Sequence, residues 1–157
     1  DYECELAVVL GRDARDVPAG QTRDYIFGYT ILNDVSARDV QTAHKQWYFG
    51  KSLDGFTPIG PCIVTADAFA DYPPRLGIRS FVNGEKRQDS NTALQIFDID
   101  HVIAELSQGM TLKAGTIIAT GTPAGVGMGM DPPQFLKPGD VVRCEIEGIG
   151  TLTNPVK

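Results

Sequence analysis

Short apolar runs, each bounded by glycine, proline or polar residues, recur along the whole chain. At residues 3–10 polar and apolar positions alternate before the sequence becomes continuously apolar, which predicts a strand. Further strands are predicted in "IFGYTILND", "PIGPCIVTA" and "TIIAT", and two more in "GDVVRCEIEGIGTLTNPV", where Gly148–Gly150 joins them. The pattern is typical of a mostly β domain of the α+β class.

The strongest local signal is the pair Asn83-Gly84 between the stretches "GIRSFV" and "EKRQ". Asn-Gly is the favoured sequence of a two-residue hairpin turn, because both positions then adopt a left-handed backbone. We therefore predict an antiparallel hairpin centred on this pair.

Two short helical segments are predicted in the first third of the chain. One lies near Gln21–Tyr25, and the other runs from about Ala37 to Lys45 with Ser36 as its N-cap.

A longer helix of two to three turns is predicted in "DIDHVIAELSQG". Asp98 or Asp100 caps its N-terminus, and Gly109 ends it. Its apolar side chains fall on one stripe, formed by Val102, Ile103 and Leu106.

With 157 residues, 42% of them hydrophobic, the chain suits one domain with a proper core, which we expect to span residues 1–157. The net charge of −6 argues against a nucleic-acid or anionic-membrane surface, since such affinity depends on Lys and Arg. The apolar runs are also too short to span a membrane.

The sequence has three cysteines, Cys4, Cys62 and Cys144. Because their number is odd and they are widely spaced, they indicate free thiols in a reducing cytoplasm.

Glu3 and Glu5 point to the same side of the first strand, because successive side chains alternate. Two adjacent carboxylates repel, and burying them without a cation is unfavourable. They are either part of a solvated strand face or a site for a hard cation such as Mg²⁺ or Ca²⁺, which prefers carboxylate oxygens. Asp34, at the end of a predicted strand, is placed to add a third carboxylate, although acids at strand ends are also common helix caps.

The segment after Asp34 carries two candidate substrate-binding residues. If it turns helical, Arg38 and Gln41 lie on one face near the carboxylates. An arginine there is suited to bind a substrate carboxylate through two parallel hydrogen bonds. The alternative is a surface ion pair between Asp34 and Arg38, which would contribute little.

Lys51 follows a glycine, which allows close backbone approach. An ammonium beside a metal-polarised carbonyl would stabilise developing enolate charge. The alternative is an ordinary solvated lysine.

The glycine-rich segment "ATGTPAGVG" matches neither a phosphate loop nor the dinucleotide fingerprint. It predicts a tight turn that could offer backbone amides and the Thr122 hydroxyl to an anion.

His101 and His44 are the two histidines of the sequence. We expect His101 to be structural, and His44 either faces the site or lies at the surface. Two histidines make no convincing Ser/His/Asp or Cys/His arrangement, so acyl-enzyme chemistry is not expected.

Taken in order, six segments resemble the catalytic core of the fumarylacetoacetate hydrolase family over essentially the whole chain: "DYECELAVVLG", "GYTILNDVSARDVQ", "GKSLDGFTPIGP", "VNGEKRQ", "TGTPAGVG" and "LKPGDVVRCEIEGIGTLTNPV". The resemblance implies a mixed β-roll or barrel-like fold with a few short helices, a homodimer, and a small 2-oxo acid or acylpyruvate as substrate. It implies a divalent metal, usually Mg²⁺, with Mn²⁺ or Ca²⁺ as substitutes. The residues it implies are Glu3, Glu5 and Asp34 as metal ligands, Arg38, Gln41 and Thr122 as substrate-binding residues, and Lys51 as the catalytic residue.

In the family, a His and a Glu of an upstream lid segment activate water, and that segment has no counterpart in this sequence. The chain also begins without Met and inside a predicted strand, so we expect it to be the later part of a longer polypeptide. The residues present explain formation of an enolate, as decarboxylation of oxaloacetate requires, more completely than hydrolysis, which also needs an activated water.

Three hypotheses follow. The first is a Mg²⁺-dependent enzyme that cleaves a C–C bond in a small 2-oxo acid through an enolate, as an acylpyruvate- or fumarylacetoacetate-type hydrolase or an oxaloacetate-type decarboxylase. The second is an isomerase or decarboxylase of 2-hydroxy-diene-dioates from aromatic breakdown. The third, of another class, is a catalytically silent ligand-binding domain.

Overall fold

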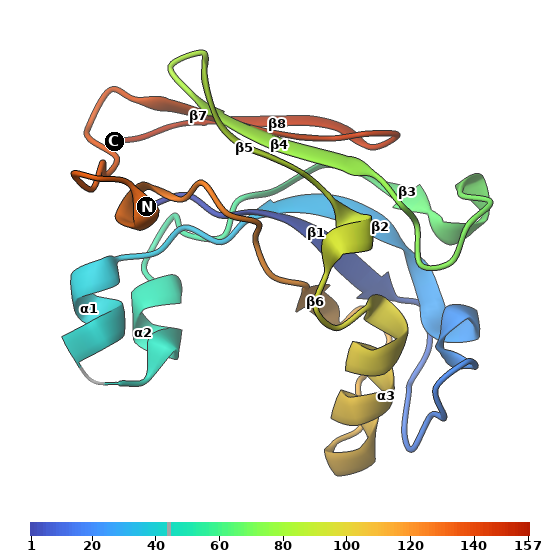
Figure 1. Ribbon diagram of the computed structural model, residues 1–157. Coiled ribbons are helices and arrows are strands. Elements are labelled where there is room, and N and C mark those ends of the chain that lie inside the picture. The colour runs from blue at the N-terminus through green and yellow to red at the C-terminus, as the bar shows by residue number, and fades with distance from the viewer. Residues whose placement is uncertain (44) are drawn as a thin grey trace.

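Two four-stranded antiparallel sheets form the framework of the computed structural model, which describes residues 1–43 and 45–157 (Figure 1). The first sheet has the order β3-β2-β1-β6 and consists of β1 (Cys4–Leu10), β2 (Ile26–Asn33), β3 (Ile59–Thr65) and β6 (Ile117–Ala119). The second has the order β5-β4-β7-β8 and consists of β4 (Gly77–Val82), β5 (Glu85–Asn91), β7 (Val141–Ile146) and β8 (Gly150–Pro155). The mostly β fold class is confirmed. His44, a candidate site residue in the sequence, lies outside the described residues.

The side chains of β1 lie at the centre of the core, and all seven of its residues are buried. Alternate residues of β1 share one face and pack in the main apolar cluster with residues of β7; the residues are Cys4, Leu6, Val8 and Leu10 of β1 and Val142, Cys144 and Ile146 of β7. Because strand side chains alternate, Glu3 and Glu5 project from the opposite face of the first sheet. The cysteines are free thiols, as predicted.

The predicted hairpin is confirmed. β4 ends at Val82 and β5 begins at Glu85, so Asn83 and Gly84 form a two-residue turn. Both turn residues have positive φ values, 53° for Asn83 and 85° for Gly84. Such a turn matches the twist of the paired strands.

The longest helix, α3 (Ile99–Gly109), agrees with the prediction. The side chain of Asp98 accepts a hydrogen bond from the His101 amide, so Asp98 is the N-cap. Asp100 instead accepts hydrogen bonds from the Gly20 amide and the Thr22 hydroxyl. The helix buries one face against the core, as its apolar stripe predicts.

The short helix predicted near Gln21–Tyr25 is confirmed as a 3-10 helix at Thr22–Tyr25, whereas the helical segments between β2 and β3 differ from the prediction. Helix α1 spans Arg38–Ala43, and Ser36 does not cap it, because the Ser36 hydroxyl donates to the carbonyl of Asp34 at 2.8 Å. A second helix, α2 (Trp47–Lys51), was not predicted. Single 3-10 turns occur at Thr22–Tyr25, Ala66–Ala68, Thr92–Leu94 and Gly127–Gly129. None of the helices in the described part of the chain is long and apolar enough to cross a membrane.

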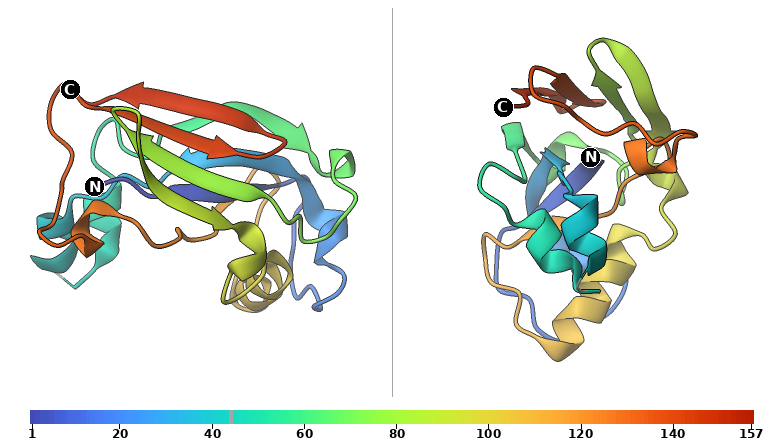
Figure 2. Two further views of the ribbon diagram at one scale, coloured as in Figure 1. Left: turned by 45° about the horizontal axis from the view of Figure 1, so that its top comes forward. Right: turned by 90° about the vertical axis from the view of Figure 1, so that its left-hand side faces the viewer.

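Helices α1 and α2 lie side by side near the first residue, away from α3 (Figures 1 and 2). Gly50 makes this close packing possible: a Cβ atom there would lie 2.8 Å from the backbone nitrogen of Gln41 and 2.9 Å from the carbonyl oxygen of Ala37. The Ala37 amide also donates to the Gly50 carbonyl at 2.9 Å. The contact holds the next residue, Lys51, beside the start of β1.

Candidate functional site

Three carboxylates converge where β1 begins and β2 ends. One oxygen each of Glu3, Glu5 and Asp34 lies within 4.8 Å of the others. The antiparallel pairing of β1 and β2 brings Asp34 there, since the Asp34 amide donates to the Glu3 carbonyl at 2.8 Å. Glu3 and Glu5 are buried, so they do not form a solvated strand face. Their role as metal ligands stays a prediction.

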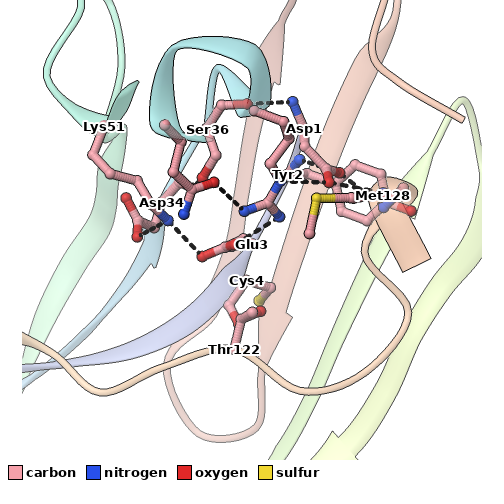
Figure 3. A network of polar contacts seen from close by, with 12 residues as sticks. Asp1, Tyr2, Glu3, Cys4, Asp34, Ser36, Lys51, Thr122 and Met128 are labelled. Atoms are coloured by element: carbon pink, nitrogen blue, oxygen red, sulfur yellow. Dashed lines mark hydrogen bonds and ion pairs between the residues drawn. The ribbon is translucent and has the colours of Figure 1, made fainter. Parts of the chain in front are cut away.

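Lys51 reaches this cluster from the end of α2 (Figure 3). Its Nζ donates to Glu3 Oε2 at 2.9 Å and to Asp34 Oδ2 at 2.6 Å. Burial by itself lowers the pKa of Lys51, but the hydrogen bonds to Asp34 and Glu3 outweigh burial, so the pKa is raised. Lys51 is therefore an ammonium at neutral pH, and the alternative of an ordinary solvated lysine is wrong.

Arg38, the first residue of α1, is 10% exposed and contacts the cluster from another side. Its NH2 nitrogen lies 2.7 Å from Glu3 Oε1, and its Nε donates to Asp1 Oδ2 at 3.0 Å. Its NH1 nitrogen donates to Gln41 Oε1 at 3.0 Å, so Arg38 and Gln41 do share one helix face. The alternative of a surface pair with Asp34 is wrong, because the ion-pair partners of Arg38 are Glu3 and Asp1.

Glu5 has no such cationic contact among the ion pairs of the described residues. Its Oε2 accepts a hydrogen bond from the Gly121 amide at 2.8 Å. Burial raises the pKa of Glu5 to about 7; the Gly121 hydrogen bond opposes this increase, and the carboxylates of Asp34 and Glu3 add to it. Glu5 is thus the carboxylate whose charge the protein compensates least.

The donor set fits a divalent cation. Four carboxylates, those of Asp1, Glu3, Glu5 and Asp34, lie around two cationic side chains, so the ionised group carries two uncompensated negative charges. Three of these carboxylates converge, and carboxylate oxygens are the ligands that Mg²⁺, Mn²⁺ and Ca²⁺ prefer. The ammonium of Lys51 lies against two of these three carboxylates, those of Glu3 and Asp34, which shows that positive charge is favoured at this position.

Thr122 lies beside the cluster in the glycine-rich segment, with its side chain held by the protein (Figure 3). Its hydroxyl donates to the Cys4 carbonyl at 3.0 Å and accepts a hydrogen bond from Gln88 Nε2 at 2.7 Å. Gln88 also accepts from the Cys4 amide at 3.1 Å, so its buried side chain joins β5 to β1 and to the Thr122 segment. A substrate-binding role for Thr122 stays a prediction.

Sequence reasoning missed two residues of this network, Asp1 and Gln88. Strand alternation places Asp1 on the same side as Glu3 and Glu5, so a signal for it was present. Gln88 carries no local signal, because its partners are distant in sequence. His101 lies on α3, away from the carboxylates, and its exposed ring stacks on Phe97 with ring centroids 4.7 Å apart; a structural role for it stays a prediction.

Comparisons with known proteins agree on one family. A family model described as "Fumarylacetoacetate (FAA) hydrolase C-terminal" matches residues 1–157. The oxaloacetate tautomerase YisK of Bacillus subtilis (strain 168) is 49% identical over 156 residues, which are 99% of this chain and 52% of YisK. The chain therefore spans about half the length of the curated relatives it matches.

Solved structures give the same result. A fumarylacetoacetate hydrolase (EaFAH) from psychrophilic Exiguobacterium antarcticum is 52% identical, with a TM-score of 0.96, and the match covers 99% of this chain and 56% of that chain. A 5-carboxymethyl-2-hydroxymuconate delta-isomerase from Mycobacterium smegmatis is 47% identical, with a TM-score of 0.88, and the match covers 98% of this chain and 57% of that chain.

Proposed function

Since the chain belongs to the fumarylacetoacetate hydrolase family, we propose that it forms the catalytic core of a divalent-metal-dependent enzyme acting on a small 2-oxo acid. The reaction that the geometry supports best is keto–enol tautomerisation of an oxaloacetate-type substrate. The observation that carries this proposal is the convergence of Glu3, Glu5 and Asp34 beside the cationic groups of Arg38 and Lys51.

Glu3, Glu5 and Asp34 would hold the metal, which we propose to be Mg²⁺, with Mn²⁺ or Ca²⁺ as substitutes. When bound, such an ion acts as a Lewis acid that polarises the 2-oxo group of the substrate. Family membership and the donor set both support this cofactor.

Arg38 would bind the substrate carboxylate. A guanidinium has five N–H bonds, and protein acceptors take one each from Nε and NH1 of Arg38, while NH2 lies in an ion pair with Glu3. Both terminal nitrogens thus keep N–H bonds, and a planar carboxylate accepts two parallel N–H bonds from a guanidinium. Gln41 supports this role by accepting from NH1.

Lys51 would stabilise the negative charge that develops on the enolate oxygen. It is an ammonium held next to the carboxylate cluster, so it can also return a proton to the substrate. Enolisation moves one proton from the carbon next to the 2-oxo group to the oxygen, and the reverse step returns it. No other bond breaks.

The names of two relatives support this reaction class. YisK is called an oxaloacetate tautomerase, and the protein from Mycobacterium smegmatis is called a delta-isomerase. An isomerase of a 2-hydroxy-diene-dioate would also use an enolate-stabilising site, so the substrate distinguishes these two possibilities.

Cleavage of a C–C bond is the second candidate function, supported by the 52% identity to a fumarylacetoacetate hydrolase. Decarboxylation of oxaloacetate and hydrolysis of an acylpyruvate both break a C–C bond and leave pyruvate as its enolate, which the same site would stabilise, but hydrolysis requires an activated water in addition. A catalytically silent ligand-binding domain is less well supported, because the carboxylates expected to hold the metal converge and the cationic side chains expected for catalysis lie beside them.

We also propose a homodimer in the cytoplasm. Exposed isoleucines on the first sheet support dimerisation: Ile59 and Ile63 of β3 and Ile117 of β6. Light scattering coupled to size exclusion tests this proposal, and a monomer at micromolar concentration would contradict it.

The experiment that tests the function combines calorimetry with a substrate panel. Wild-type protein and E5Q are titrated with Mg²⁺, with and without oxalate as an enolate mimic, and then assayed with enol oxaloacetate, an acylpyruvate and a hydroxydienedioate. We expect wild type to bind Mg²⁺, to bind oxalate more tightly with Mg²⁺, and to consume enol oxaloacetate without releasing pyruvate. Pyruvate release would favour C–C cleavage, and equal Mg²⁺ affinity of the two proteins would contradict the metal site.

A further inference from the structure

The carboxylate of Asp1 is fully buried beside the site, yet it is not among the three carboxylates that converge. Its Oδ1 accepts hydrogen bonds from the amides of Tyr2 at 2.9 Å and Gly127 at 2.8 Å. Its Oδ2 accepts from the Met128 amide at 2.9 Å and from Arg38 Nε at 3.0 Å (Figure 3). Each oxygen thus has two donors, which stabilise the buried anion.

The contact with Asp1 completes the orientation of the Arg38 guanidinium. Glu3 holds NH2, Gln41 holds NH1, and Asp1 holds Nε. The three nitrogens of a guanidinium are coplanar, so one oxygen in contact with each nitrogen, through two hydrogen bonds and one ion pair, sets both the plane and its rotation. Loss of the Nε acceptor would leave the plane free to tilt about the other two contacts.

The loop that holds Asp1 is shaped for this carboxylate. A Cβ atom on Gly127 would lie 2.0 Å from the Gln134 carbonyl oxygen and 2.9 Å from Asp1 Oδ1, so no larger residue fits without displacement of the backbone. Gly127 and Met128 thereby present consecutive amides to the two oxygens of Asp1. The Asp1 carboxylate thus connects this loop to the guanidinium of Arg38.

We infer that Asp1 is a positioning residue, whose carboxylate holds Arg38 in the orientation that binds the carboxylate of a 2-oxo acid. The inference rests on the proposed function, in which Arg38 binds that group. Asp1 does not touch the substrate; it acts through Arg38.

The test compares D1N with D140N. Asn has nearly the shape of Asp but has lost one acceptor and the charge, so either orientation of its amide leaves two of the four donors unmatched. Asp140 is a matched control, because its exposed carboxylate also accepts hydrogen bonds from both a backbone amide and a side chain. The donors are the backbone amide of Lys137 and the side-chain amide of Asn83. Each purified protein is titrated with Mg²⁺ and then with oxalate at saturating Mg²⁺.

We expect D1N to weaken oxalate binding by about tenfold or more and to change Mg²⁺ affinity by less than about fivefold. With oxaloacetate as substrate, KM rises more than kcat falls. D140N matches wild type in both titrations. Equal oxalate affinity of D1N and wild type would overturn the inference.

A double-mutant cycle separates positioning from a general structural role. If Asp1 acts through Arg38, R38Q and D1N/R38Q bind oxalate equally, within about twofold. A further loss on adding D1N to R38Q would overturn the role of Asp1 and leave the proposed function intact. Wild-type oxalate affinity in R38Q would overturn the role of Arg38 and, with it, that of Asp1.

D1N removes a buried anion, so the melting temperature of the variant is measured first to establish that it folds. A second experiment tests the same contact in the wild-type protein, without any substitution. In a ¹H–¹⁵N spectrum of arginine side chains, the Nε–H signal assigned to Arg38 through its loss in R38Q should exchange slowly with water. Slow exchange supports the contact with Asp1, and exchange as fast as that of the exposed Arg15 would overturn it.

Discussion

The ammonium of Lys51 donates a hydrogen bond to the carboxylate of Asp34 at 2.6 Å, which joins the end of α2 to the residue that follows β2. The pair lies within the cluster that would hold the metal. The positive charge of Lys51 therefore has two opposed effects. It weakens metal binding, because it competes with the cation for the oxygens of Glu3 and Asp34, and it favours catalysis, because it can stabilise an enolate.

Replacing Lys51 by Met separates these effects. We expect K51M to bind Mg²⁺ about tenfold more tightly, because a competing positive charge is removed from Glu3 and Asp34. We expect kcat to fall by about a hundredfold or more, because the enolate loses its stabilising ammonium. Calorimetry and steady-state kinetics measure the two quantities. K113M is the control, since Lys113 pairs with Asp13 at the surface, and weaker Mg²⁺ binding in K51M would contradict the prediction.

The raised pKa of Glu5, about 7, predicts that metal binding depends on pH. Below pH 7 the metal must displace a proton from Glu5, so Mg²⁺ affinity should fall by up to about tenfold per pH unit. Calorimetry in two buffers of different ionisation enthalpy should detect this proton release at pH 6 and not at pH 8.5. When E5Q binds Mg²⁺, this proton release should disappear. If E5Q releases as many protons as the wild type, the protons come from a group other than Glu5.

The same shift predicts how metal-free stability varies with pH. The pKa of Glu5 is about 7 in the folded protein against a reference value of 4.5, so between these values the folded state holds a proton that the unfolded state has lost. The contribution of Glu5 to stability therefore declines as pH rises from about 4.5 to 7. Bound Mg²⁺ compensates for this decline, so the increase in Tm on adding Mg²⁺ should be larger at pH 8 than at pH 6. A larger increase at pH 6 would contradict the prediction.

Substitution of Gly50 by Ala tests the packing of α2 on α1. The new Cβ would lie 2.8 Å from the Gln41 nitrogen and 2.9 Å from the Ala37 oxygen, both backbone atoms that cannot move independently. We expect a loss of about 1–3 kcal/mol in the free energy of unfolding, together with weaker oxalate binding, because Lys51 and Arg38 shift. Gly109 at the end of α3 is the matched control, since a Cβ there meets nothing within 4 Å. G109A should change stability by less than about 0.5 kcal/mol in denaturant titrations.

Gln88 and Ser80 form a second matched pair, because they lie opposite each other on β5 and β4 and both are fully buried. The Gln88 amide has hydrogen bonds to Cys4, Thr122 and Pro123, so Q88L leaves buried polar groups without partners. We expect it to lower the free energy of unfolding by about 2–4 kcal/mol. The Ser80 hydroxyl has no hydrogen-bond partner within the described residues, so S80A should be neutral or slightly stabilising. Equal losses in both variants would contradict this explanation.

The sequence by itself determined the features that depend on local backbone geometry. Alternation predicted β1 and placed Glu3 and Glu5 on one side, and the left-handed preference of Asn83-Gly84 predicted the hairpin. The helical periodicity and the capping preference of Asp98 predicted α3. Each of these signals acts over a few residues, so no distant contact is needed to interpret it.

Only the tertiary structure decided which side chains share the site and what each one contacts. The β1–β2 register brings Asp34 next to Glu3, and the absence of a Cβ at Gly50 lets α2 bring Lys51 to both. Alternation places Asp1 on the side of Glu3 and Glu5, but Asp1 and Gln88 have partners up to 127 residues away, so no local pattern could reveal which groups these two side chains contact. The hydrogen bonds of a buried polar side chain depend on strand register and on packing between distant segments, which a local pattern does not specify.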